Sequence, residues 1–403
     1  MLLGWVAFSL VAGVAPSFLP RLLKEYGTSD PQIIIIITVS MAAVFVSGLA
    51  IGFFSDICRT QWGRRRPFIL LSTPFAAVFL ALIPFAPDLF KWLPEGSPIT
   101  VVLISVVLVV GYQFFCIFIS SAAFYYMIPD VVPHSHLGRF YALSKIVGWL
   151  VGFLFTACLS QYAAEYMKPA FVAAAALYGV SMFLICWQVR EGEYPPRFQW
   201  WRDPRRSTKK IPYYLAIFFT LGCMVWAGAI SALGSVFYRD DLGLSLATIG
   251  KAGVPAGIIG ALIAYPIGVL VDRWKAESAL LYGQTGVLLL ALGAFFCLHG
   301  PVSFVIFTCL AALPAGLVFV AKAKWIVNVY PREFFGTFST LGAFAASAGG
   351  ILLGPLSGWL FDMTRYYRGI YLWSAFFTAL SIAGLVAVRR LRKSMEDGAG
   401  ATE

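Results

Sequence analysis

The sequence is poor in charged residues. Of its 403 residues only 12% are Asp, Glu, Lys or Arg, whereas 60% are apolar. A soluble globular domain carries about 25% charged residues. This composition excludes an ordinary soluble protein and indicates a chain that is buried in lipid.

Motifs for catalysis and metal binding are also missing from the sequence. It contains no phosphate-binding loop, nucleophile elbow or metalloprotease helix, so nothing indicates an enzyme or a bound cofactor. The seven cysteines show neither disulfide nor zinc spacing. His134 and His136 have no third ligand nearby, so we predict no metal site.

Long apolar runs dominate the chain instead. A helix needs about 20 mostly apolar residues to cross a bilayer. Twelve such runs can be drawn, near 2–23, 32–55, 67–87, 99–127, 139–163, 169–188, 212–237, 245–271, 278–298, 302–327, 336–360 and 369–388. We therefore predict an all-α membrane protein with twelve transmembrane helices.

Basic residues are distributed unevenly between the loops. With the Arg-rich loop 59–66 placed inside, the inner loops and the C-terminal tail carry 19 Lys and Arg, and the outer loops carry seven. Basic loops stay on the cytoplasmic side, which predicts a cytoplasmic-membrane protein with both termini in the cytoplasm. The net charge of +11 then reflects orientation and not binding of nucleic acid.

The longest inner loop divides the chain into halves. We predict a six-helix bundle at 1–189, a basic linker at 190–211, a second six-helix bundle at 212–390 and a cytoplasmic tail at 391–403.

Two landmarks recur in the same order in both halves. Ile51-Gly-Phe-Phe-Ser-Asp56 returns as Ile267-Gly-Val-Leu-Val-Asp272, and the loop 133–140 returns as 331–338. This order predicts two pseudo-symmetric halves that are parallel repeats.

One stretch carries a family resemblance. A Gly52-x-x-x-Asp56 helix end, six residues, and then Gly63-Arg-Arg-Arg-Pro-Phe68 resembles the loop between helices 2 and 3 of major facilitator transporters. The long spacing and the Arg-Arg-Arg-Pro-Phe ending resemble the glycoside-pentoside-hexuronide:cation symporter family, and its sucrose-transporter-like branch most closely. The resemblance implies a twelve-helix major facilitator bundle with two halves that rock about a central site lined by helices 1, 4, 7 and 10.

The resemblance also implies coupling to H⁺ or Na⁺, but the sequence departs from the family here. None of the 19 acidic residues lies in the middle of an apolar run, so coupling stays open. Asp130 could exchange a proton if it pairs with Arg139 or Lys145, although a structural ion pair is the favoured interpretation.

Charged residues at inner helix ends are candidates for conformational gating. A helix N-terminus carries partial positive charge, and in the family fold helix 2 ends beside the start of helix 11. We therefore expect Asp56 to face Gly336, and Asp272 to face Gly138. The candidate gating residues are Gly52, Asp56, Arg64, Arg65, Asp130, Arg139, Asp272 and Arg273.

Aromatic, amide and hydroxyl side chains on helices 4 and 7 are candidates for solute binding, because rings stack on the C–H face of a polyol while amides bond its hydroxyls. With one lysine of helix 10, the candidates are Tyr112, Gln113, Ser121, Tyr125, Trp226, Ser231 and Lys322.

Lys322 is included because intramembrane charge is rare and functional by default. It lies nine residues before Pro331, about 13 Å along a helix and close to the midplane. Lys324 lies on roughly the opposite face, and we expect it to snorkel to the inner surface.

Small residues in helices 5 and 11 predict close helix packing, and among them we expect Gly350 to be intolerant of a leucine.

These features predict a secondary active or facilitative transporter of a small solute, a sugar or glycoside, that works by alternating access. The alternative is an anionic solute such as a uronide, organic acid or lysophospholipid, and a non-transporting receptor or assembly factor is a third class. The expected partners are the solute and membrane lipid, and we expect a monomer.

Overall fold

The computed structural model describes residues 1–25, 51–58, 60–90, 98–116, 122–154, 166–191, 210–228, 237–364 and 366–400. Within these residues the chain is helical and contains no strand. Among the described residues seven helices are long and apolar enough to cross a membrane, and three shorter apolar helices accompany them. The predicted all-α membrane bundle is confirmed.

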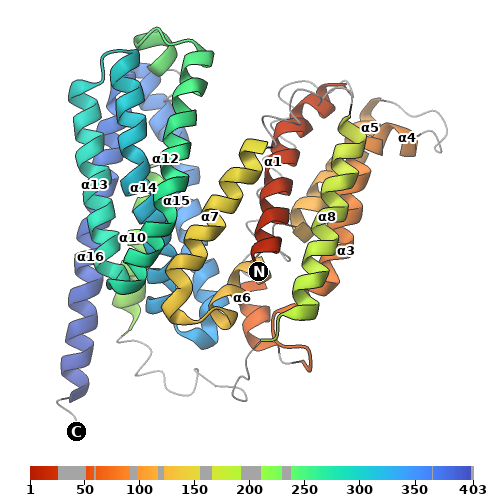
Figure 1. Ribbon diagram of the computed structural model, residues 1–403, viewed down its shortest axis with the longest axis horizontal. Helices are drawn as coiled ribbons and strands as arrows, with labels where there is room; N and C mark the ends of the chain where they lie inside the picture. Colours follow the sequence, from red (N-terminus) through yellow and green to blue (C-terminus); the bar gives the residue numbers. More distant parts are fainter. Residues whose placement is uncertain are drawn as a thin grey trace. The chain divides into compact units, whose positions relative to one another are not determined.

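The helices gather into two compact units. Unit 1 comprises residues 1–134, 143–194 and 331–338, and unit 2 comprises 135–142, 195–330 and 339–403. Figure 1 shows the course of the chain through the helices of each unit.

Unit 1 is built mainly from the first half of the sequence. It contains α1 (Leu2–Glu25), α3 (Arg66–Leu82), α4 (Ala86–Phe90), α5 (Pro98–Tyr112), α6 (Ala122–Val131) and α8 (Met167–Gln188). Within it α3 packs against α8 and α5, and α1 packs against α8. The core side chains Ile69, Ala76, Leu80, Phe171 and Tyr178 come from the facing sides of α3 and α8.

Unit 2 is built mainly from the second half. It contains α10 (Ile211–Trp226), α12 (Leu246–Arg273), α13 (Ala276–Cys297), α14 (Pro301–Val329) and α16 (Ile370–Gly400). Within it α14 packs against α12 and α13, while α16 packs against α10 and α13. Pro255 and Pro266 lie inside α12, which stays one continuous helix.

Two helices are divided between the units. The first residues of α7 (Leu137–Leu154) belong to unit 2, and the first residues of α15 (Phe335–Thr364) belong to unit 1. Each unit therefore holds the start of a helix whose remainder is grouped with the other unit, and these two starts are where the charged residues converge.

Several predicted segments lie outside the described residues, among them most of the second span and of the linker 190–211. The predicted tail stays a prediction, and the structure adds that α16 continues past the predicted span 369–388 to Gly400. An ion pair one turn apart, from Arg392 Nε to Glu396 Oε1 at 3.0 Å, supports this extension.

Candidate functional site

Four charged side chains form a buried group in unit 1, which we call the Asp56 cluster: Asp56, Arg64, Arg65 and Asp130. Arg64 Nη2 lies 2.9 Å from Asp130 Oδ1 and Arg65 Nε lies 2.8 Å from Asp130 Oδ2. Arg65 Nη2 lies 3.4 Å from Asp56 Oδ1. Both arginine side chains are fully buried. Because two positive charges meet two negative ones, each buried charge is compensated, which is the condition for keeping charges out of water.

Asp56 also binds the start of α15. Its Oδ1 accepts the Gly336 N–H at 3.1 Å, and its Oδ2 accepts the Thr337 N–H at 2.6 Å and hydroxyl at 2.9 Å. A carboxylate placed on the free amides of a helix N-terminus gains both hydrogen bonds and the helix dipole. The contact expected between Asp56 and Gly336 is present, and its role in gating stays a prediction.

A close helix approach makes this contact possible. A Cβ added to Gly336 would lie 2.9 Å from Gly52 O and 2.9 Å from Asp56 Oδ1, so only glycine fits without a shift. Asp56 is 3% exposed. Its burial raises the pKa of the carboxyl above the ordinary value, while Arg65 and the Thr337 amide act in the opposite direction.

The arginines extend the cluster to the loop before α15. Arg64 Nη2 and Nη1 donate to the carbonyls of Arg332 and Glu333 at 3.1 and 3.2 Å. The Arg65 guanidinium lies over the rings of Tyr126 and Phe335, 5.4 and 6.0 Å from their centroids. One half of the sequence is thereby bonded to the first turn of a helix from the other half.

Glu191 is a site residue that the sequence analysis missed. Its carboxylate accepts the backbone N–H groups of Arg64, Arg65 and Arg66 at 2.8, 3.0 and 2.8 Å. These are the free amides at the start of α3, and Gly63, at φ +107°, turns the chain into them. Glu191 lies three residues after the end of α8, within the predicted linker 190–211, but nothing in the sequence indicates its partner.

Replacing Glu191 with alanine is expected to lower the free energy of unfolding by about 1–3 kcal/mol, because three partly buried amides lose a charged acceptor. Thermal unfolding of the purified protein in detergent measures the change. The control is Asp88→Ala, which breaks the exposed 2.7 Å pair between Asp88 and Lys168 and should cost less than about 1 kcal/mol. If both variants lower the free energy of unfolding by the same amount, the Glu191 contact contributes no more to stability than an exposed ion pair.

Unit 2 contains a counterpart around Asp272, at the end of α12. Its Oδ1 accepts the Gly138 N–H at 2.8 Å and its Oδ2 accepts the Arg139 N–H at 3.1 Å. A Cβ on Gly138 would lie 2.7 Å from the Gly268 carbonyl, which repeats the approach of Gly336 to Gly52. The expected contact between Asp272 and Gly138 is therefore present, in the geometry that the internal repeat predicts.

Lys324 corrects one expectation. It does not snorkel to the surface: it is 4% exposed, and its Nζ donates to Asp272 Oδ1 at 2.8 Å and to the Val271 carbonyl at 3.3 Å. The physical reason is that α14 packs against α12 and places Lys324 beside the buried Asp272 side chain, so each charge compensates the other.

The partners of the other gating candidates also differ from expectation. Asp130 binds Arg64 and Arg65, not Arg139 or Lys145. Arg139 instead lies near Asp272, with Nε 3.6 Å from Oδ2. Arg273 is exposed and makes no ion pair with the described residues.

Lys322 lies on an accessible face of α14. At 3.6 residues per turn, Ile306, Leu310 and Leu313 form one exposed stripe, and Phe319 and the half-buried Lys322 lie about half a turn away. An exposed stripe of leucine and isoleucine is the face that meets lipid, so the Lys322 face points elsewhere. Lys322 makes no hydrogen bond or ion pair with any residue that the structure describes.

The remaining solute candidates have separate surroundings. Gln113 is half-buried and opens a π-helical turn, 113–116, a feature frequent at functional sites. Tyr112 is buried at 2% exposure. Tyr125 packs against Trp5 of α1, with ring centroids 6.3 Å apart. Trp5 is an aromatic neighbour that the sequence analysis did not name. Ser121 and Ser231 lie outside the described residues.

Trp226 serves as a packing centre in unit 2. Its Nε1 donates to the Ala346 carbonyl at 2.7 Å, and its own carbonyl accepts the Trp373 Nε1–H at 3.0 Å. Its ring also packs edge-on against Phe377, with centroids 5.9 Å apart. The single N–H donor of this candidate is therefore already used within unit 2.

Gly349 and Gly350 both belong to the small residues predicted to pack in α15, and among the described atoms only Gly349 has a close neighbour. A Cβ on Gly349 would overlap the Trp226 ring, whereas one on Gly350 would meet no described atom within 4 Å. Gly349→Leu is expected to destabilise the protein by about 1–3 kcal/mol through overpacking, and Gly350→Leu by less than about 0.5 kcal/mol. Thermal unfolding of the two variants checks this, and a larger loss at Gly350 would contradict it.

Fold and site together define a bundle of apolar helices with duplicated helix-end contacts. A model of the Major Facilitator Superfamily matches residues 1–300, most of the chain. The chain therefore belongs to the Major Facilitator Superfamily.

Solved structures agree with this fold over nearly the whole chain. A bacterial homologue of the iron transporter ferroportin, in an outward-facing state, has a TM-score of 0.73 at 13% identity and covers 96% of this chain and 98% of its own. The E. coli fucose:proton symporter FucP has a TM-score of 0.69 at 13% sequence identity, and the match covers 96% of this chain and 97% of FucP. The human organic anion transporter MFSD10 has a TM-score of 0.66 at 14% sequence identity, and the match covers 96% of this chain and 97% of MFSD10. At these identities the likeness shows the fold alone.

Proposed function

We propose that this protein carries a small solute across the cytoplasmic membrane by alternating access. The observation that carries the proposal is the pair of contacts from Asp56 to Gly336 and from Asp272 to Gly138. Each joins the end of a helix in one half of the sequence to the start of a helix in the other half. Such contacts stabilise one state and must break for the halves to move, because a hydrogen bond is lost once donor and acceptor are more than about 3.5 Å apart.

The solute that we propose is a sugar or glycoside. Support comes from the family resemblance of the Arg-rich loop and from the type of side chain at the candidate positions. Gln113, in its π-helical turn, offers an amide to hydroxyl groups. Tyr125 offers a ring beside Trp5, and rings suit the C–H face of a sugar. On the same fold, FucP is a fucose:proton symporter.

An anionic solute is the second candidate, and Lys322 favours it. This amine lies near the predicted midplane, on a face of α14 away from the exposed aliphatic stripe, without an ion pair among the described residues. A lone charge in that position calls for a counter-charge, which a carboxylate or phosphate of the solute would supply. On the same fold, MFSD10 is an organic anion transporter.

Uptake into proteoliposomes tests both candidates. Labelled neutral sugars and labelled uronates are offered in parallel, with and without an imposed H⁺ or Na⁺ gradient, which reports coupling in the same assay. Thermal shift of the purified protein with each solute is the independent measurement, because a bound ligand stabilises by mass action. If no solute is taken up and none shifts the unfolding temperature, a non-transporting role replaces this proposal.

A further inference from the structure

We propose that a groove between α13 and α16, at the ends that the charge distribution places on the cytoplasmic side, binds a phospholipid with a zwitterionic headgroup. The headgroup in question carries a phosphate and a primary ammonium group. This site lies apart from the solute candidates and does not depend on the identity of the solute.

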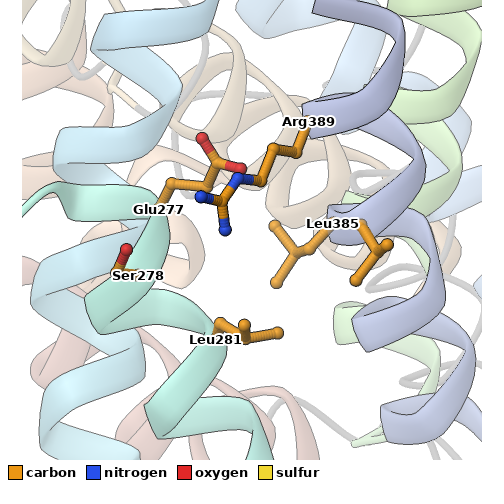
Figure 2. A pocket seen from close by; sticks show the side chains of 6 residues that line it. Glu277, Ser278, Leu281, Leu385 and Arg389 are labelled. Atoms are coloured by element: carbon orange, nitrogen blue, oxygen red, sulfur yellow. The ribbon is translucent and has the colours of Figure 1, made fainter. Parts of the chain in front are cut away.

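The groove is a small cavity with charged and apolar walls. It is lined by Glu277, Ser278 and Leu281 of α13 and by Leu385, Val386 and Arg389 of α16. Figure 2 shows the Glu277 and Arg389 side chains together at one end of the opening, and the leucines Leu281 and Leu385 further along it. The opening thus offers a polar end and an apolar end, as the headgroup region and first acyl carbons of a lipid require.

The position of the groove along the membrane matches this division. Glu277 directly precedes the predicted span 278–298, and Arg389 directly follows the predicted span 369–388. The two charges therefore lie at the level of the lipid headgroups, while Leu281 and Leu385 lie on the hydrocarbon side. Grooves between transmembrane helices with basic residues at this level are typical headgroup sites.

The charges of the groove are available for a ligand. Further along α16, Arg392 and Glu396 form an ion pair with each other, with Arg392 Nε 3.0 Å from Glu396 Oε1. Glu277 and Arg389, by contrast, form no ion pair with each other or with any other residue that the structure describes. Arg389 is exposed and Glu277 is half-buried, so both can reach a headgroup.

The opposite signs of these two residues select the headgroup. A purely anionic lipid would gain from Arg389 but would be repelled by Glu277. A headgroup with both charges satisfies both residues: Arg389 donates to the phosphate, and Glu277 accepts from the ammonium. A primary ammonium has N–H donors for this, whereas the quaternary ammonium of choline has none. The groove is therefore expected to prefer phosphatidylethanolamine over phosphatidylcholine and phosphatidylglycerol.

Lipid retention measures the preference. The full-length protein is reconstituted in nanodiscs that hold equal parts of the three lipids, and is then extracted in mild detergent, and the retained lipids are counted by native mass spectrometry. Wild-type protein is expected to retain severalfold more phosphatidylethanolamine than phosphatidylcholine. Glu277→Gln should lose this ratio and gain phosphatidylglycerol, because the repulsion is removed, and a merely structural role of Glu277 would not produce that exchange. Arg389→Gln should lose both phosphatidylethanolamine and phosphatidylglycerol.

Two further variants keep the test decisive. Arg389→Lys keeps the charge and should retain the wild-type preference even if Arg389→Gln folds poorly. Arg390→Gln removes an exposed neighbouring charge that does not line the groove, and it should leave the lipid ratio unchanged. Equal retention of all three lipids by the wild type, or retention of phosphatidylglycerol alone, would overturn the proposal.

Discussion

Asp56→Asn is expected to reduce solute uptake by at least about tenfold. The carboxylate accepts two backbone amides and one hydroxyl from the start of α15 and also faces Arg64 and Arg65. Removing one member of a buried charge group costs about 3–5 kcal/mol, and each 1.4 kcal/mol changes an equilibrium tenfold. If the contact belongs to one state of the transport cycle, that state loses most of its population.

The measurement is initial uptake in proteoliposomes, normalised to the amount of folded protein from thermal unfolding. Gly336→Ala is the companion variant: it keeps every charge but places a Cβ 2.9 Å from Asp56 Oδ1 and from the Gly52 carbonyl, so it should also slow uptake. The control is Asp88→Asn, which alters an exposed pair whose Asp88 side chain is 40% exposed and should leave uptake near wild type. Normal uptake by both Asp56→Asn and Gly336→Ala would show that this contact does not gate transport.

The Asp56 and Asp272 contacts could be predicted because their determinants are local in sequence. A Gly-x-x-x-Asp helix end and a helix start with glycine are short sequence patterns, and each occurs twice. A contact expected for one copy is therefore expected for the other copy as well. The family resemblance supplied which helix end meets which helix start. The structure then shows Asp56 on the Gly336 and Thr337 amides, and Asp272 on the Gly138 and Arg139 amides.

The partners inside each cluster could not be predicted in this way. Glu191 reaches the amides of residues 64–66 across more than 120 positions of sequence, and no pattern marks that distance. Lys324 was expected to snorkel because helical spacing tells which residues share a face but not what that face meets. Only the packing of α14 against α12 brings Lys324 to Asp272.

The sequence also could not show which of two neighbouring small residues faces the adjacent side chain. Gly349 and Gly350 are adjacent small residues, and the sequence treats them alike. The Trp226 ring lies against the first and not the second, a difference that depends on the rotation of α15 about its axis within unit 2. A rotation of 100° per residue thus separates a position packed against Trp226 from one with no described neighbour.

Lys322→Gln is expected to separate the two solute classes. Its predicted position is near the bilayer midplane, where an ammonium costs about 3 kcal/mol on insertion scales, so a charge at that depth needs compensation. No described residue pairs with it, and a solute anion would provide the missing charge. Truncating one partner of such a pair costs about 2–5 kcal/mol, so uptake of uronates or other organic anions should fall by more than about tenfold, while uptake of a neutral sugar persists.

A neutral solute gives a different result for the same variant. Glutamine still donates a hydrogen bond to a sugar hydroxyl, so a sugar transporter should keep uptake within about tenfold of wild type. Lys324→Gln is the matched control two residues away: it strips Asp272 of its 2.8 Å partner and should lower thermal stability and uptake of every solute alike. If Lys322→Gln leaves uptake and thermal shift unchanged for sugars and anions both, Lys322 does not belong to the solute site, and the case for an anionic solute disappears with it.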